Sequence, residues 1–195
     1  MTGIKAAIAA ILLIVFPLCA VAAPYSAIVI DADTGKVLHS ENANTRLHPA
    51  GLTKLSTLYM AFEAIAAGEV DLDEKVRISA NAASEPIAAL GMREGQRVTI
   101  KDLLQASAIK GANDASTALA EAISGSELAF TKRLDEMAER LGMSRSSFMN
   151  AHGLTEKGHL STAADTAILM VELIKKFPEE VLLLGQLDGI AAGKK

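Results

Sequence analysis

Cysteine is nearly absent from this sequence, and aromatic residues are rare. The one cysteine is Cys19, tryptophan is missing, and aromatic residues make up only 4% of the 195 residues. A single cysteine excludes an intramolecular disulfide, and any metal site would have to be built from histidines and carboxylates. Because half of the residues are apolar but few are aromatic, and alanine is abundant, the composition favours closely packed helices over a β-sandwich.

Basic clusters are lacking as well. The formal net charge is −4 at pH 7, and no run of lysine and arginine is interleaved with aromatic residues. Proteins that bind nucleic acid usually carry such a basic surface. The sequence therefore predicts no nucleic-acid partner.

The first 22 residues have the pattern of a secretory signal peptide. Lys5 supplies a positive charge, Ala6–Leu18 is an apolar run, and Ala-Val-Ala at residues 20–22 offers a cleavage site. The apolar run is shorter than the roughly 20 residues that a membrane-spanning helix needs. We therefore expect a secreted, periplasmic protein whose domain covers residues 23–195, and membrane contact only through an uncleaved signal segment.

The domain begins with a predicted β-hairpin. Residues Ser26–Ile30 alternate and are rich in β-branched side chains, "DADTG" has the composition of a turn, and Val37–Ser40 returns. The rest of the chain has the apolar spacing of helices. Gly68 is expected to end the first helix, Ser126 to cap the fourth, and Ser161 or Thr162 to cap the fifth. The predicted helices cover residues 52–67, 101–108 (opened by Val98-Thr99-Ile100), 114–123, 127–141 and 163–176.

Six segments, in this order, resemble the secreted serine D-alanyl-D-alanine carboxypeptidases, which are low-molecular-weight penicillin-binding proteins. The segments are "IVIDADTGKVLHSENAN", "PAGLTKLSTLYMAFEA", "VTIKDLLQASAIKGANDASTALAE", "FTKRLDEMAERLGM", "SFMNAHGL" and "GHLSTAADTAILM". The resemblance extends from Tyr25 to about Glu180. It implies an α+β fold, the N-terminal β-hairpin plus helical module of a β-lactamase/transpeptidase-like fold. It also implies a truncated domain with the C-terminal sheet strands missing, so that the exposed hairpin edge offers a surface for association.

The resemblance also implies a set of catalytic positions. The family uses Ser-x-x-Lys, Ser-x-Asn and Lys-Thr-Gly. The first serine attacks, the lysine takes its proton, the second serine relays a proton, and the asparagine holds the substrate amide. In this sequence the first motif is Gly51-Leu-Thr-Lys54 and the second is Gly111-Ala-Asn113, while Lys-Thr-Gly does not occur. Gly51 thus stands at the position of the missing nucleophile, and Gly111 at the position of the missing relay serine.

Other interpretations of these residues either fit the sequence less well than a role in the motifs or are compatible with such a role. Lys54 as an idle surface lysine fits its motif poorly, whereas Asn113 could cap the following helix as well as bind substrate, and Gly51 could be a cap glycine. Thr53 and Ser56 are not expected to replace the nucleophile, because neither shares the helix face of Lys54.

The histidines give no metal signature. His48, His152 and His159 lie in predicted loops and lack the i, i+4 spacing of helical ligands. We therefore expect no metal and no cofactor.

Together these features predict a homologue of the enzymes that cleave D-Ala-D-Ala from peptidoglycan stem peptides, itself catalytically inactive. Its expected ligands are a stem peptide or a β-lactam. Two alternatives remain open. One is a non-catalytic module that binds peptidoglycan or a partner protein, and the other is a gene fragment without a stable function.

Overall fold

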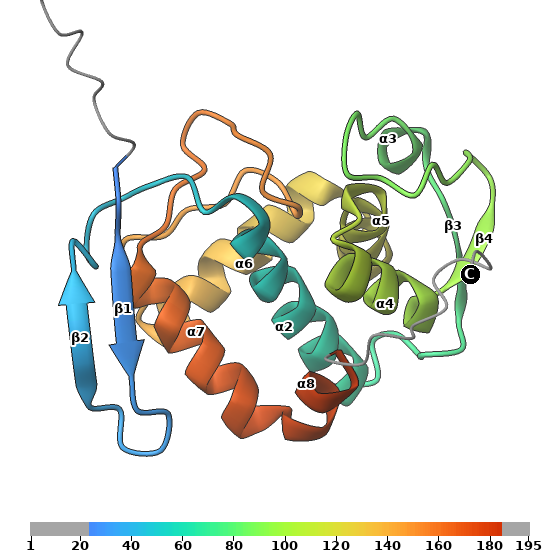
Figure 1. Ribbon diagram of the computed structural model, residues 1–195. Coiled ribbons are helices and arrows are strands. Elements are labelled where there is room, and N and C mark those ends of the chain that lie inside the picture. Colours follow the sequence, from blue (N-terminus) through green and yellow to red (C-terminus); the bar gives the residue numbers. More distant parts are fainter. Residues whose placement is uncertain (1–23, 185–195) are drawn as a thin grey trace, which may run out of the picture.

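The computed structural model describes residues 24–184. The predicted signal peptide, residues 1–22, lies outside the described residues. Helices surround the central helix α2 (Thr53–Ala66), and a β-hairpin lies on one side, next to α7 (Ala163–Lys176) (Figure 1). This mixture of a hairpin and a helical module is the predicted α+β arrangement. No helix among residues 24–184 combines the length and the apolar character that crossing a membrane requires.

The hairpin is formed by β1 (Ala27–Ile30) and β2 (Val37–Glu41), within one residue of the prediction. The strands are antiparallel, and their register shifts between Val29 and Ile30. In the turn, a carboxylate oxygen of Asp31 accepts hydrogen bonds from the N–H and the hydroxyl of Thr34. β1 contacts α7, whereas every residue of β2 is exposed.

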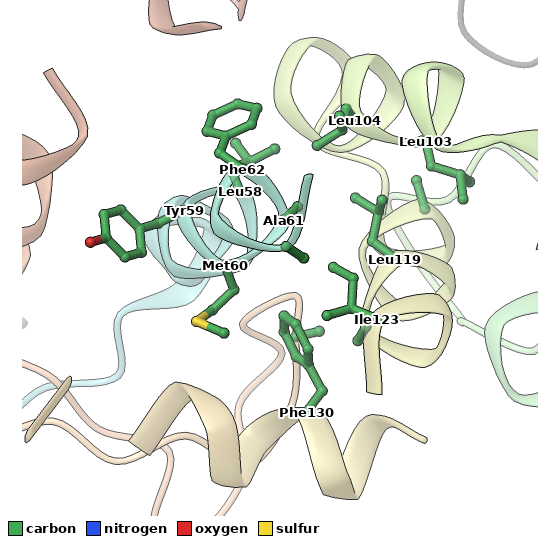
Figure 2. Packing of buried hydrophobic residues seen from close by; sticks show 14 of the residues in the cluster. Leu58, Tyr59, Met60, Ala61, Phe62, Leu103, Leu104, Leu119, Ile123 and Phe130 are labelled. Carbon is green, nitrogen blue, oxygen red and sulfur yellow. The ribbon is translucent and has the colours of Figure 1, made fainter. Parts of the chain in front are cut away.

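Helix α2 lies at the centre of the core because its middle segment, residues 58–62, is apolar on all sides. Residues 58–62 are five consecutive buried residues, which a helix can bury only when neighbours surround it. Those neighbours are α4 (Ile100–Lys110), α5 (Asn113–Ser124), α6 (Glu127–Leu141) and α7. Figure 2 shows side chains of α2 next to Leu103, Leu104, Leu119, Ile123 and Phe130.

The helix ends follow the predicted capping chemistry. The Ser126 hydroxyl accepts the N–H of Ala129 at the start of α6, and the Thr162 hydroxyl accepts the N–H of Asp165 at the start of α7. Gly142 ends α6 in the left-handed conformation, with φ of 79°. Side-chain caps and left-handed glycines therefore set these boundaries, as the sequence indicated.

The prediction that Val98 and Thr99 open a helix is wrong. They belong to β4 (Arg97–Thr99), which pairs with β3 (Lys75–Arg77), and Val98 is buried there. The hydroxyl of Thr99 then accepts the N–H of Asp102, so that this residue ends the strand and caps α4. Two short helices were also not predicted, α3 (Ala80–Ala83) and α8 (Pro178–Leu184).

Candidate active site

Lys54 lies in the first turn of α2, and its amine joins two other parts of the chain. Nζ donates one hydrogen bond to Oδ1 of Asn113 at 2.7 Å and another to the carbonyl oxygen of His152 at 2.8 Å. Burial lowers the pKa of Lys54, and the negative charge of Glu85 partly opposes that shift. The amine is thus held in a fixed position at the meeting point of α2, α5 and the loop before α7.

A pocket of about 540 Å³ lies in front of this amine. All four predicted site positions line it, so the structure brings Gly51, Lys54, Gly111 and Asn113 together. The remaining lining residues are mostly apolar: Ala50, Leu52, Leu55, Leu58, Ile87, Ala88, Ser107, Ala108, Lys110, His152, Gly153 and Leu154.

The two glycines differ in what a side chain would meet. Gly51 lies in a 3-10 turn, η1 (Ala50–Leu52), and the interpretation of Gly51 as the cap residue is wrong because Leu52 occupies the N-cap of α2. A Cβ added at position 51 would have no atom within 4 Å. Gly111 also faces open space, but its φ is +65°, a conformation that disfavours other residues. A serine would fit without strain at 51 and with strain at 111.

Asn113 does not cap α5, contrary to the expectation for that side chain. The N-cap is Ala112, and no side chain caps this helix. The Asn113 amide instead accepts from Lys54 and donates to the carbonyl oxygen of Ile87 at 2.9 Å. Its side chain therefore links the site lysine to the loop that carries Ile87 and Ala88, on the pocket wall.

The hydroxyls of Thr53 and Ser56 do not line the pocket. Thr53 is buried, and its Oγ1 lies 2.8 Å from Nε2 of His159. Ser56 is also buried. The prediction that neither shares the face of Lys54 is confirmed.

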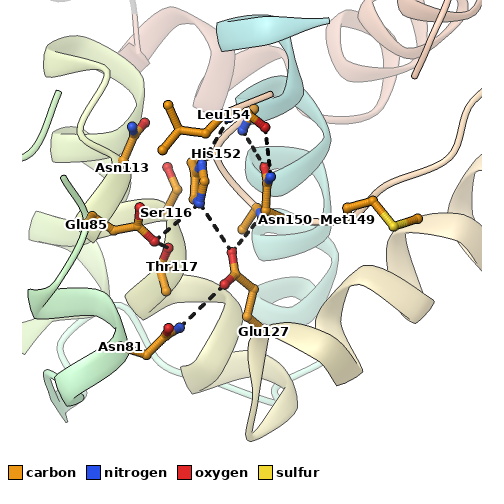
Figure 3. A network of polar contacts seen from close by, with 12 residues as sticks. Asn81, Glu85, Asn113, Ser116, Thr117, Glu127, Met149, Asn150, His152 and Leu154 are labelled. Carbon is orange, nitrogen blue, oxygen red and sulfur yellow. Dashed lines mark hydrogen bonds and ion pairs between the residues drawn. The ribbon is translucent and has the colours of Figure 1, made fainter. Parts of the chain in front are cut away.

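Two histidines that the sequence left without a role are buried, and one of them, His152, lines the pocket. His152 lies between two carboxylates, with Nε2 3.2 Å from Oε1 of Glu85 and 3.6 Å from Oε1 of Glu127 (Figure 3). Burial lowers the pKa of His152 and raises that of Glu85. The sequence offered little reason to expect that His152 is buried, because polar residues in a loop are usually exposed. The only signal was its place in the short segment "NAHGL", between an asparagine and a glycine.

The cluster of His152, Glu85 and Glu127 has the composition of a metal site but not the hydrogen bonding of one. Nδ1 of His152 accepts the N–H of Leu154 at 3.1 Å, so the proton of the neutral ring is on Nε2 and points at the carboxylates. A metal ligand needs the Nε2 lone pair, and its other nitrogen normally donates. These residues therefore fit a hydrogen-bonded clamp better than a metal.

His159 should make the fold sensitive to acid. The ring is fully buried, Nδ1 accepts the N–H of Met149, and burial lowers its pKa to about 4, with repulsion from His152, once that ring is protonated in acid, adding to the shift. Below pH 6.5 the unfolded chain binds a proton that the folded protein refuses, so stability falls as the pH falls. We expect a loss of about 3 kcal/mol in the free energy of unfolding between pH 7 and pH 4.

The measurement is urea unfolding at several pH values for the unaltered protein and for His159→Gln. Glutamine can donate to Thr53 and accept from Met149, but it does not titrate, so the variant should lose about 3 kcal/mol less over this range. Exposed His39, changed in the same way, is the matched control. Parallel curves for the unaltered protein and the His159 variant would contradict the assignment.

Comparison with known proteins identifies D-alanyl-D-alanine carboxypeptidases among the relatives of this chain. A family model described as D-alanyl-D-alanine carboxypeptidase, peptidase S11, matches residues 17–185. D-alanyl-D-alanine carboxypeptidase DacF of Bacillus subtilis is 45% identical over 150 residues, which are 77% of this chain and 39% of DacF. The chain spans about two fifths of the length of the curated relatives it matches.

Solved structures agree with this similarity. The peptidoglycan synthesis regulatory factor PBP3 of Streptococcus pneumoniae superposes with a TM-score of 0.80 at 30% identity, over 87% of this chain and 56% of that chain. Penicillin-binding protein D2 of Listeria monocytogenes, in its cefotaxime-bound form, gives a TM-score of 0.70 at 30% identity, over 79% of this chain and 63% of that one. The predicted fold class is confirmed.

Proposed function

The chain belongs to the D-alanyl-D-alanine carboxypeptidase family, peptidase S11, and from that membership we propose that it binds peptides ending in D-alanine without cleaving them. The observation that carries this proposal is the pair of glycines at the serine positions of a pocket that keeps its lysine and asparagine. Binding groups are thus present where the attacking group is absent.

The absence of a hydroxyl at position 51 supports the loss of catalysis. Acyl transfer in this family, as its motifs imply, begins when a hydroxyl attacks the carbonyl carbon. Gly51 offers no such atom, and Thr53 and Ser56 are buried residues that do not line the pocket. Removing the nucleophile from a serine hydrolase leaves only what binding and electrostatics provide, which is a small part of the acceleration.

The retained groups support binding. Lys54 and Asn113 are hydrogen-bonded to each other, and Asn113 is held on its other side by the Ile87 carbonyl. Asp114 accepts the N–H groups of Leu90 and Met92, both at 3.1 Å, which fixes the same wall of the pocket. A site whose polar groups are held in place before the ligand arrives loses less entropy on binding.

The proposed ligand class is supported by relatives, and the proposed compartment by the N-terminal residues. Penicillin-binding protein D2 of Listeria monocytogenes has been solved in cefotaxime-bound and ampicillin-bound forms. We propose β-lactams as non-covalent ligands of this pocket too, beside peptidoglycan stem peptides. The leader-like residues 1–22 support a location in the periplasm, where these peptides are found.

The test is equilibrium binding combined with a search for turnover. An N-acetylated peptide ending in D-Ala-D-Ala is expected to bind saturably in calorimetry, while no free D-alanine appears during prolonged incubation. Lys54→Met should weaken binding, whereas Lys36→Met in the exposed hairpin turn should not. Release of D-alanine by the purified chain would overturn the proposal of inactivity, and no binding of any D-alanine-ended peptide would overturn the proposal of binding.

A further inference from the structure

The pocket is cationic although the whole chain is acidic. Lys54 and Lys110 line it, and no aspartate or glutamate is among its lining residues. The third ionisable residue in the lining is His152, whose Nδ1 accepts the N–H of Leu154 and therefore carries no proton, as in a neutral ring. The chain as a whole carries a formal charge of −4. A positive, largely apolar pocket on an acidic protein selects for a negatively charged ligand with an apolar body.

The Lys54 ammonium has an unused donor. An ammonium carries three N–H groups, and two of them go to Asn113 and to the His152 carbonyl. Among the residues that the structure describes, the third N–H makes no hydrogen bond. Glu85 is the acidic residue that acts on Lys54, but its Oε1 is already held by the hydroxyl of Thr117 and by the His152 ring. The third N–H can therefore donate to a ligand oxygen that replaces solvent in the pocket.

Gly51 leaves room for that acceptor. Positions 51 and 54 are three residues apart at the start of α2, and residues with this spacing are neighbours on a helix surface. A serine at 51 would place its hydroxyl beside the ammonium and occupy the unused donor. Glycine places nothing there, because a Cβ at this position would meet no atom within 4 Å.

We propose that this pocket prefers the product of the family's reaction to its substrate. The proposal rests on the proposed binding function. Removing the last residue from a D-Ala-D-Ala peptide leaves a peptide whose new end is a D-alanine carboxylate. That carboxylate fits where the serine hydroxyl would be and accepts a charge-assisted hydrogen bond from Lys54. In the uncleaved peptide the same position holds a neutral amide carbonyl, which pairs less strongly with an ammonium.

The experiment compares three ligands by isothermal titration calorimetry at pH 7. They are an N-acetylated peptide ending in D-Ala-D-Ala, the same peptide with one D-alanine fewer, and the C-terminal amide of the shorter peptide. The shorter acid is expected to bind at least about tenfold more tightly than the longer peptide or the shorter amide. Each of these two ligands presents a neutral amide, and not a carboxylate, at the position beside Lys54. The shorter amide is the matched control, because it differs from the acid only in charge and hydrogen-bonding pattern.

Two substitutions examine the cause of the preference. Gly51→Ser should reduce or reverse it, because the hydroxyl then occupies the carboxylate position, and the open space at Gly51 makes this variant safe for the fold. Lys54→Met should abolish it, with thermal melting used to establish that the variant is folded. If the longer peptide binds as tightly as the shorter acid, product preference is wrong while the binding function stands. If none of the three ligands binds, the binding function itself is wrong.

Discussion

Replacing Gly153 by alanine is expected to destabilise the protein by about 3–5 kcal/mol, the sum of overpacking and backbone strain. Gly153 has φ of +94°, which L side chains rarely adopt. Its added Cβ would overlap the carbonyl oxygen of Ala50 and would lie 2.8 Å from Oγ1 of Thr53. Ala50 itself has φ of +48°, so the backbone that would have to move is already in an unfavourable conformation.

Chemical denaturation and thermal melting measure this change. The melting temperature should fall by about 10 °C or more. Gly158→Ala is the matched control, because Gly158 also has φ of +94° but its Cβ would meet only Met149, at 3.6 Å or more. Gly158→Ala therefore isolates the backbone strain, of order 1 kcal/mol. Equal losses for the two variants would show that the close approach to Ala50 is unimportant.

The Gly153 contact also explains how a distant loop forms part of the pocket. The loop containing His152 and Gly153 lies directly against the residues that begin α2, and a larger residue at 153 would keep it away. The His152 carbonyl could then no longer accept from Lys54. We therefore expect Gly153→Ala to weaken peptide binding as well as stability, whereas Gly158→Ala should affect neither strongly.

The helices and the first hairpin were predictable because local chemistry determines them. Apolar spacing identified α2, α6 and α7, and Ser126 and Thr162 cap the helices that the sequence assigned to them. The β3–β4 hairpin was not predictable. Its strands are three residues long and twenty residues apart in the chain, so neither alternation nor a tight turn marks them.

The sequence named four motif positions that the structure places around one pocket, but it did not indicate what surrounds them. Gly51, Lys54, Gly111 and Asn113 line one pocket because motif spacing carries over between related chains. The contacts of His152 join Glu85, from the loop after α3, and Glu127, from α6, to the loop before α7. These segments are far apart in the sequence, and only the folded chain brings them together. Asn113 was misassigned as a cap because Asn before a helix normally caps it, whereas here Lys54 and Ile87 use its side chain.

Penicillin should not acylate the unaltered chain. The resemblance implies that a serine at this position would form the covalent adduct, and loss of the nucleophilic serine lowers kcat by about a millionfold in subtilisin. With Gly51 in that position, intact mass spectrometry after hours with a labelled penicillin should show only the unmodified protein. A family member that carries the serine of the Ser-x-x-Lys motif is the positive control. An adduct on the unaltered chain would overturn the proposed inactivity.

Restoring the serines should return only part of this reactivity in the 195-residue chain. Gly51→Ser places a hydroxyl one turn from Lys54 in open space, while Gly111→Ser adds the relay hydroxyl at the cost of left-handed strain, about 1 kcal/mol. The resemblance implies that the oxyanion receives one N–H from residue 51 and one from the Lys-Thr-Gly strand, and these 195 residues contain no Lys-Thr-Gly. Losing one such donor slows a comparable hydrolase by about 100–1,000-fold. The double variant should therefore label at least about 100-fold more slowly than the positive control, as followed by gel fluorescence over time. Labelling at the control's rate would mean that the pocket around Lys54 supplies the second donor itself.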